Sequence, residues 1–209
     1  MLEIIPLHEI PESFPQNYEQ GILGLVPLTK ISSVIESSPN KSILENGDVI
    51  LAIAELKSPR MGQLRNHLST LPDGEIPLKV LRNGSAVDLI GHIKAGKLGI
   101  LLEGALDIPI IAQPFFAVSQ QDELVQLDGK PSVTPTSVDG LQFIGGYEIL
   151  SINSEPVNNW TDIRAAVTAS DGQLKLTLIN PETNKKFWVT IPVTVTQRDE
   201  IASLGWTTS

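Results

Sequence analysis

A repeat with a period of 99 residues is the feature that most constrains the fold of this chain. Residues 46–68 read NGDVILAIAELKSPRMGQLRNHL, and residues 145–167 read GGYEILSINSEPVNNWTDIRAAV. Shifting the first stretch by 99 places sets Gly47 on Gly146 and Arg65 on Arg164, and it matches apolar residues at six further positions. A chain of 209 residues has room for two ordinary domains. Two similar units in tandem are therefore predicted.

The first copy predicts the order strand, helix, hairpin. Residues Asp48–Ile53 form a β-branched and aliphatic run that is typical of a strand. Ser58-Pro59 suits the N-cap and the first position of a helix, and apolar residues at helical spacing extend that helix over 59–71. Asn83-Gly84, between two alternating apolar runs, predicts a tight hairpin turn.

The second copy predicts the same order. A strand is expected over Glu148–Ile152, and a helix from about Asn159 to 168 with Asp162 at its third helical position. The hairpin then follows, with its turn at Asn180 to Lys186 and its return strand at Phe187–Ile191. Each copy therefore contains one complete unit.

Composition excludes several classes of function. The formal charge is −9, with 15 Lys+Arg against 24 Asp+Glu, whereas nucleic acid and anionic membranes attract basic clusters. No cysteine is present, so disulfides and thiolate metal sites are impossible. His8, His67 and His92 are scattered, His8-Glu9 does not continue as HExxH, and no G-x-S-x-G motif occurs. The chain is expected to be inactive as an enzyme and to hold no metal or cofactor.

The arrangement of short motifs resembles PDZ domains of the bacterial type. The loop Ile22-Leu23-Gly24-Leu25, the turn Ser38-Pro39 and the run NGDVILAI occur in the order typical of that family, and SVDGLQFIGGYEILSINSEPV follows the same pattern in the second copy. The likeness covers roughly residues 21–93 and 98–193. It implies an α+β, mainly β fold with two tandem PDZ-like, partly open β-barrels capped by helices.

A narrower likeness points to the PDZ domains of membrane-embedded site-2 metalloproteases. It is carried by PVNNWTDIRAAV at 156–167 and by LTLINPETNKKFWVTIPV, and the departures are Met61 in place of the tryptophan, Asn153-Ser154 in place of Asn-Gly, and Tyr147 in place of aspartate. By this resemblance the chain is an excised soluble segment on the periplasmic or extracytoplasmic face of a bacterial membrane. Zinc and the membrane segments are expected only in the parent protein.

Recurring Leu-Gly pairs suggest where the units begin and end. Residues 21–97 are expected to form the first PDZ-like domain and 98–193 the second, with a loop insertion at about 113–137 that includes Phe115-Phe116. Residues 1–20 resemble the end strand of a preceding unit plus a linker. Residues 194–209 form a tail or the start of a further unit.

The resemblance implies one peptide groove in each domain, between a glycine-containing loop and a helix. The partners expected for these grooves are peptide or protein C-termini, or protease substrates, bound by a monomer. The first groove joins Gly21, Ile22, Leu23, Gly24 and Leu25 to Met61, Leu64, Arg65 and Leu68. The second joins Leu98, Gly99, Ile100 and Leu101 to Trp160, Ile163, Arg164 and Val167.

A second interpretation stays open for the helical residues of both grooves. An amphipathic helix that covers a small sheet needs Leu64, Leu68, Ile163 and Val167 for its core whether or not a peptide binds. Arginines on such a helix are commonly solvated, and a tryptophan at a helix start can anchor the helix to the sheet.

Three functions are compatible with these patterns. The resemblance favours a regulatory PDZ module of a membrane-associated zinc protease, which controls substrate access or senses peptide C-termini. The alternatives are a PDZ module of a periplasmic serine protease and a scaffold or secretion component with no enzyme attached.

Overall fold

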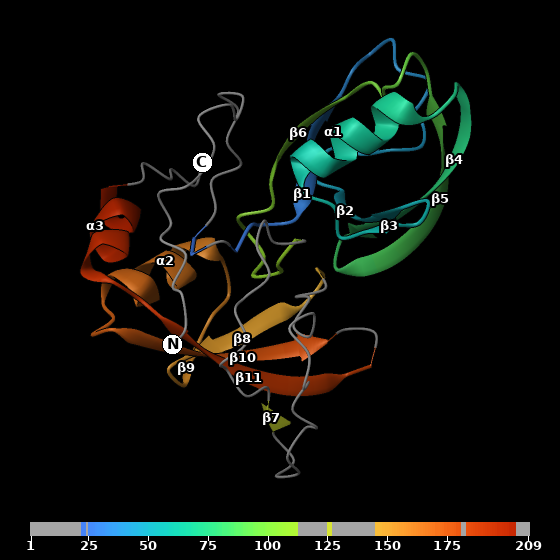
Figure 1. Cartoon of the computed structure of the whole chain (residues 1–209). Helices are drawn as coiled ribbons and strands as arrows, with labels where there is room; N and C mark the ends of the chain where they lie inside the picture. Colours follow the sequence, from blue (N-terminus) through green and yellow to red (C-terminus); the bar gives the residue numbers. More distant parts are fainter. Residues whose placement is uncertain (1–21, 24, 113–124, 127–144, 181–182, 204–209) are drawn as a thin grey trace.

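A computed structural model describes residues 22–23, 25–112, 125–126, 145–180 and 183–203 of the chain. The fold is α+β and mainly β, with two antiparallel sheets and three helices in these residues (Figure 1). The predicted fold class is confirmed at this level. The sheets lie in two units, and each has its own buried apolar core.

The first sheet has the strand order β5-β4-β2-β1-β6, and the short strand β3 pairs with β2. Helix α1 (Met61–Thr70) covers this sheet, and its buried residues Leu64 and Leu68 belong to the first core. The strands are β1 (Thr29–Val34), β2 (Val49–Ile53), β3 (Leu56–Lys57), β4 (Gly74–Arg82), β5 (Ser85–Ile93) and β6 (Ile100–Gly104).

The second sheet has the order β7-β11-β10-β8-β9. Helix α2 (Trp160–Thr168) covers it, and helix α3 (Val195–Ser203) packs against α2 (Figure 1). The strands are β7 (Val125–Gln126), β8 (Glu148–Ile152), β9 (Glu155–Pro156), β10 (Gln173–Asn180) and β11 (Lys185–Pro192).

The predicted repeat is confirmed element by element. Strand β2 begins at Val49 and β8 at Glu148, which is the counterpart of residue 49 by the shift of 99 places, and the starts of β3 and β9 and of α1 and α2 show the same shift. Gly47 and Gly146, which precede β2 and β8, both have a positive φ, of +93° and +99°. Only glycine adopts such angles without strain, which explains why both turns carry it.

The two helix starts differ. Asn159 caps α2 as predicted, because its side chain accepts a hydrogen bond from the Asp162 amide at 3.0 Å. The predicted start of the first helix at Ser58-Pro59 is wrong: the N-cap is Arg60, whose amide donates to Gln63 Oε1 at 3.0 Å. Ser58 has a φ of +46°, which no helical residue adopts, so the helix cannot begin until the chain has left that turn.

The two hairpins differ only in the length of their connections. Asn83-Gly84 forms the predicted two-residue turn, and both residues have positive φ, of +51° and +77°. In the second unit, Asn180 pairs with Lys185 at the end of the ladder, so β11 begins two residues before the predicted Phe187. The Asn184 amide donates to the Asn180 carbonyl at 2.8 Å and closes this longer turn.

The first unit is continuous in sequence from β1 to β6, whereas a segment that precedes it lies with the second unit. Strand β6 pairs with β1 of the first sheet from Thr29↔Gly104 to Val34↔Ile100. Residues 25–28 directly precede β1, yet they lie beside 110–112, with the Ala112 amide donating to Val26 O at 2.7 Å. Residues 110–112 in turn pair with the start of β8 through the bridge Ile110↔Glu148. The chain therefore crosses from the second unit to the first before β1 and returns after β6.

A small apolar cluster and an ion pair hold the crossing together. Val26, Leu28, Val49, Ala105 and Ala112 pack as a buried cluster where the two chain crossings meet. Lys30 on β1 lies 2.9 Å from Asp107 and 3.3 Å from Glu103. Burial by itself lowers the pKa of Lys30, but the hydrogen bonds and attraction from both carboxylates outweigh it, so the pKa is raised above its usual value.

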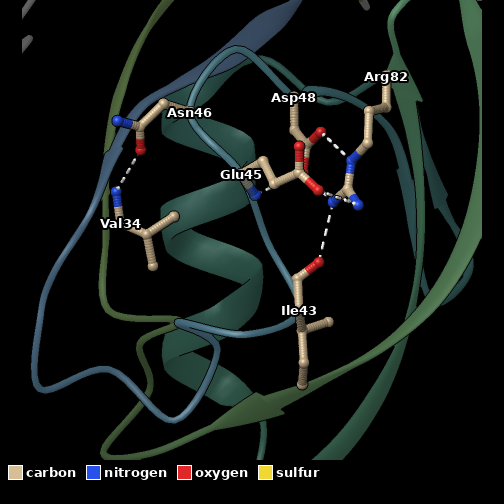
Figure 2. Close-up of polar contacts among 6 residues, drawn as sticks. All are labelled: Val34, Ile43, Glu45, Asn46, Asp48 and Arg82. Carbon is tan, nitrogen blue, oxygen red and sulfur yellow. Dashed lines mark hydrogen bonds and ion pairs between the residues drawn. The ribbon is translucent and has the colours of Figure 1, made fainter.

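A buried carboxylate fixes the turn that leads into β2. Asp48 is buried, and its two oxygens accept from Nε and Nη2 of Arg82 on β4, each at 2.7 Å (Figure 2). Arg82 also donates to the Ile43 carbonyl at 2.9 Å and lies 2.8 Å from Glu45. The hydrogen bonds that Arg82 donates to Asp48 raise the pKa of Arg82, although its burial works in the opposite direction.

The second unit replaces this ion pair with a neutral hydrogen bond. Tyr147 stands at the position that matches Asp48, and its hydroxyl accepts from Nδ2 of Asn180, at the end of β10, at 3.3 Å. Where the second unit has Tyr147 in place of aspartate, the partner of this side chain therefore changes as well, from Arg82 in the first unit to Asn180 in the second.

Candidate functional site

The structure pairs the predicted loops and helices the other way round. The prediction placed Ile22 to Leu25 opposite α1 and Leu98 to Leu101 opposite α2. Instead, Ile22 and Leu25 pack in the second core with Trp160, whereas Leu98 packs in the first core. The predicted pairing is corrected, because residues 22–23 and 25–28 lie with the second unit, whereas 98–104 continue the first unit into β6. Gly21 and Gly24 lie outside the described residues.

Helix α1 packs beside β6 of the first sheet (Figure 1). His67 Nε2 lies 3.7 Å from Glu55 in the turn between β2 and β3, so His67 marks the flank of the helix that faces this turn. Met61, Arg65 and Leu68 follow one another at intervals of four and three residues on another flank of α1. The predicted first groove corresponds to the surface between that flank and β6, the edge strand of the sheet.

The loop that leads into β6 is held from below by two polar side chains. Ser38 Oγ and Asn40 Nδ2 both donate to the Leu98 carbonyl, each at 2.8 Å. Asn40 is fully buried, and it also donates to the His92 carbonyl and accepts from the His92 amide, at 2.8 and 2.7 Å. The loop conformation is therefore fixed before any ligand arrives.

This support fixes the direction of two backbone amides. In a trans peptide the carbonyl and the following N–H point in opposite directions. Because the Leu98 carbonyl faces Ser38, the Gly99 N–H points away from it. The Gly99 carbonyl accepts from the amide of Ile35, the residue that follows β1, at 3.0 Å. The Ile100 N–H therefore points away from β1. Two adjacent N–H groups of this kind form a site for an anion.

Glycine is required at position 99. Its φ is +69°, and a Cβ there would lie 2.6 Å from Ser38 Oγ. A side chain would push the loop off its polar support. The sequence motifs identify glycine in the loop, but no sequence pattern distinguishes Asn40, whose amide is buried, from an ordinary asparagine in a turn.

Apolar and basic side chains line this first groove. Met61, Ile100 and Leu102 are half-buried, Leu68 is buried, and Arg65 is exposed. Ile100 and Leu102 face the core while Leu101, 56% exposed, faces the other side of the sheet. This surface therefore combines apolar side chains, a sheet edge that is unpaired within the described residues, and the Gly99 and Ile100 amides at one end.

The equivalent surface in the second unit is closed. Trp160, Ile163 and Val167 are buried together with Ile22 and Leu25. Helix α3 adds Ile201 to this core.

Arg164, the counterpart of Arg65, holds the end of α3. Its Nε donates to the Ile201 carbonyl at 3.1 Å and its Nη2 to the Ala202 carbonyl at 2.7 Å. Of the two grooves, the first is thus the accessible one.

The described part of the chain contains no group of three His, Asp or Glu side chains that could hold a metal ion. None of its helices is long and apolar enough to cross a membrane. A cavity of about 440 Å³ lies along β2, β4 and β5, lined mainly by apolar residues with Lys79 and Asp88. The predicted insertion at 113–137 lies outside the described residues, except for β7.

No protein-family model and no curated protein matches this chain.

Proposed function

We propose that the groove between β6 and α1 binds the C-terminal residues of a peptide or protein, in the manner of a PDZ domain. The observation that carries the proposal is the direction of the Gly99 and Ile100 amides, which point away from the partners of the preceding carbonyls, beside a sheet edge that is unpaired within the described residues. We infer that these amides form a site for an anion. The peptide would add to β6 as a further strand, and its carboxylate would lie at these amides.

The apolar floor sets a requirement on the last residue of the ligand. Leu68 and Leu98 lie near the loop, and Ile100 and Leu102 continue the apolar surface along β6. An apolar terminal side chain would remove this surface from water, which contributes about 25 cal/mol per Å² buried. A charged terminal side chain would lose its hydration without gaining a partner there.

We further propose that the module belongs to a membrane-associated zinc protease, in which it controls substrate access from the extracytoplasmic side. This rests on the likeness of Pro156 to Val167 to the site-2 protease family. The position of Trp160 supports this likeness, because the tryptophan is buried and begins the helix that covers the second sheet.

The test of the binding proposal uses a library of random heptapeptides displayed with free C-termini. An enriched peptide should bind the full chain in a fluorescence anisotropy titration, and its C-terminal amide should bind about tenfold more weakly, because one charge-assisted hydrogen-bond site is lost.

Two neighbouring substitutions on β6 provide the control. Ile100→Asp places a carboxylate in the groove and should abolish binding, whereas Leu101→Asp places it on the opposite side of the same strand and should preserve binding. Unfolding curves would establish that both variants are folded. Equal affinity for acid and amide peptides, or equal loss in the two variants, would refute the proposal.

A further inference from the structure

Strand β5, at the edge of the first sheet opposite to β6, carries a row of backbone groups that need partners. The His92 amide and carbonyl face away from β4, because they bond to the side chain of Asn40 at 2.7 and 2.8 Å. In an antiparallel ladder alternate residues point their backbone groups the same way, so those of Ile90, Asp88 and Ala86 face outward as well. Within the described residues these groups have no backbone partner. The free stretch of β5 is therefore 86–90.

This edge lacks the features that commonly keep an edge strand from pairing. Strand β5 pairs with β4 over nine residues without a bulge, and it contains no Pro, Lys or Arg. Ile90 is 52% exposed. The cavity of about 440 Å³ lies beside it, bordered by Ile90 and Asp88 on β5 and by Ala52 and Ala54 at the end of β2. An unpaired edge next to an exposed apolar side chain and a cavity favours the addition of a further strand.

The second unit provides an internal precedent for such an addition. Strands β5 and β11 match by a shift of 100 places, because Leu89 and Val189 each pair with the leucine that faces the last residue of β2 or β8. Strand β7 pairs antiparallel with β11 at Phe187 and Trp188. The counterparts of these two residues are 87 and 88, in the middle of the free stretch. The first unit thus leaves open a position that the second unit fills with a strand.

The charge at this position identifies the chemistry of the partner. Asp88 is exposed and forms no ion pair within the described residues, although Lys79 lies directly opposite it on β4. A strand added on the other side of β5 would place one of its side chains opposite Asp88. The β5 strand of a second copy is a poor match, because the two-fold register over 86–90 sets one Asp88 against the other. A basic side chain is the complementary one.

We propose that the free stretch of β5 binds an extended internal segment of a partner protein, with Lys or Arg opposite Asp88 and an apolar residue two places before it. Because the segment runs antiparallel to β5, its residue opposite Ile90 comes two places before the one opposite Asp88. The apolar side chain covers Ile90 beside the cavity. Recognition by backbone groups along the strand needs no free carboxylate, so this site is independent of the groove proposed at β6.

The selection experiment uses random heptapeptides fused to a carrier protein at both ends, so that no C-terminus is free. The full chain should enrich peptides with an apolar residue two places before Lys or Arg. Asp88→Lys should enrich Asp or Glu in place of the basic residue. Glu75→Lys is the matched control: it makes the same change of charge on β4, opposite His92 and beyond the free stretch, and should select as the wild type does.

Hydrogen exchange of the full chain then locates the bound peptide, acetylated and amidated at its ends. At saturation the amides of Ala86, Asp88 and Ile90 should exchange at least about tenfold more slowly, while those of Val87 and Leu89, which already bond to β4, stay unchanged. Asp88→Asn should bind the same peptide about three- to fivefold more weakly, as expected for an exposed ion pair.

Three results would overturn this inference without touching the proposed groove at β6. They are the absence of any enriched peptide, an enriched motif that keeps its basic residue in Asp88→Lys, and slowed exchange on β6 in place of the alternating pattern on β5. Failure of the free-carboxylate selection described above would, conversely, leave the β5 site unaffected.

Discussion

At the scale of residues, the two units fix the turn before a central strand with different interactions, an ion pair in the first and a neutral hydrogen bond in the second. Asp48 and Tyr147 occupy matching positions before the first central strand of each sheet, and each is tied to the end of the following long strand. Only one partner of the charged pair is fully buried, because the Asp48 side chain is 1% exposed and the Arg82 side chain is 20% exposed. Removing one partner of such a pair leaves the other desolvated and uncompensated.

We therefore expect Asp48→Asn to cost about 3 kcal/mol of unfolding free energy, at the lower end for a broken buried pair because Arg82 keeps Glu45 and some solvent. Tyr147→Phe, which removes one neutral hydrogen bond, should cost about 1 kcal/mol. Urea unfolding followed separately in each unit by hydrogen exchange measures both values. Equal losses in the two variants would contradict the assigned difference.

At the scale of elements, α3 explains why one groove is closed. A helix of nine residues is not stable alone, so it depends on the buried Ile201 and on the bonds from Arg164 and Arg198. Arg164 binds carbonyls at the C-terminal end of α3, where the helix leaves its own acceptors unsatisfied.

Arg164→Gln should loosen α3 specifically. We expect the amides of Val195–Ser203 to exchange about tenfold faster, which corresponds to roughly 1.4 kcal/mol of lost local stability. Arg65→Gln is the matched control at the equivalent position of the first unit and should leave α3 unchanged. Unaltered exchange in Arg164→Gln would mean that the apolar contact alone holds the helix.

At the scale of the whole molecule, two crossings of the chain connect the units. The chain passes from residue 28 beside the second unit directly into β1 of the first, and from β6 of the first into 110–112 of the second. Helix α1 and β6 therefore lie within one continuous stretch of the chain, from β1 to β6. A peptide bound to β6 would lie on the same strand that leads into the second unit.

The repeat made the interior of each unit predictable, but it did not predict which unit each Leu-Gly segment joins. Glycine turns, the Asn83-Gly84 hairpin and the helix faces are local patterns, and they appear where predicted. The partner of each Leu-Gly segment depends on contacts between distant residues, and both segments are apolar enough to fit either sheet.

The most direct test of the central claim, that β6 completes the groove of the first unit, is an engineered disulfide. Ser33 and Leu101 are direct partners across β1 and β6, and the chain has no cysteine of its own. Ser33→Cys/Leu101→Cys should form an intramolecular disulfide on mild oxidation of the dilute monomer, detected by peptide mapping with mass spectrometry. Leu101→Cys/Ala165→Cys, which joins β6 to α2, should stay reduced. A disulfide in the second pair and none in the first would contradict the pairing of β6 with β1, and with it the proposed groove that includes β6.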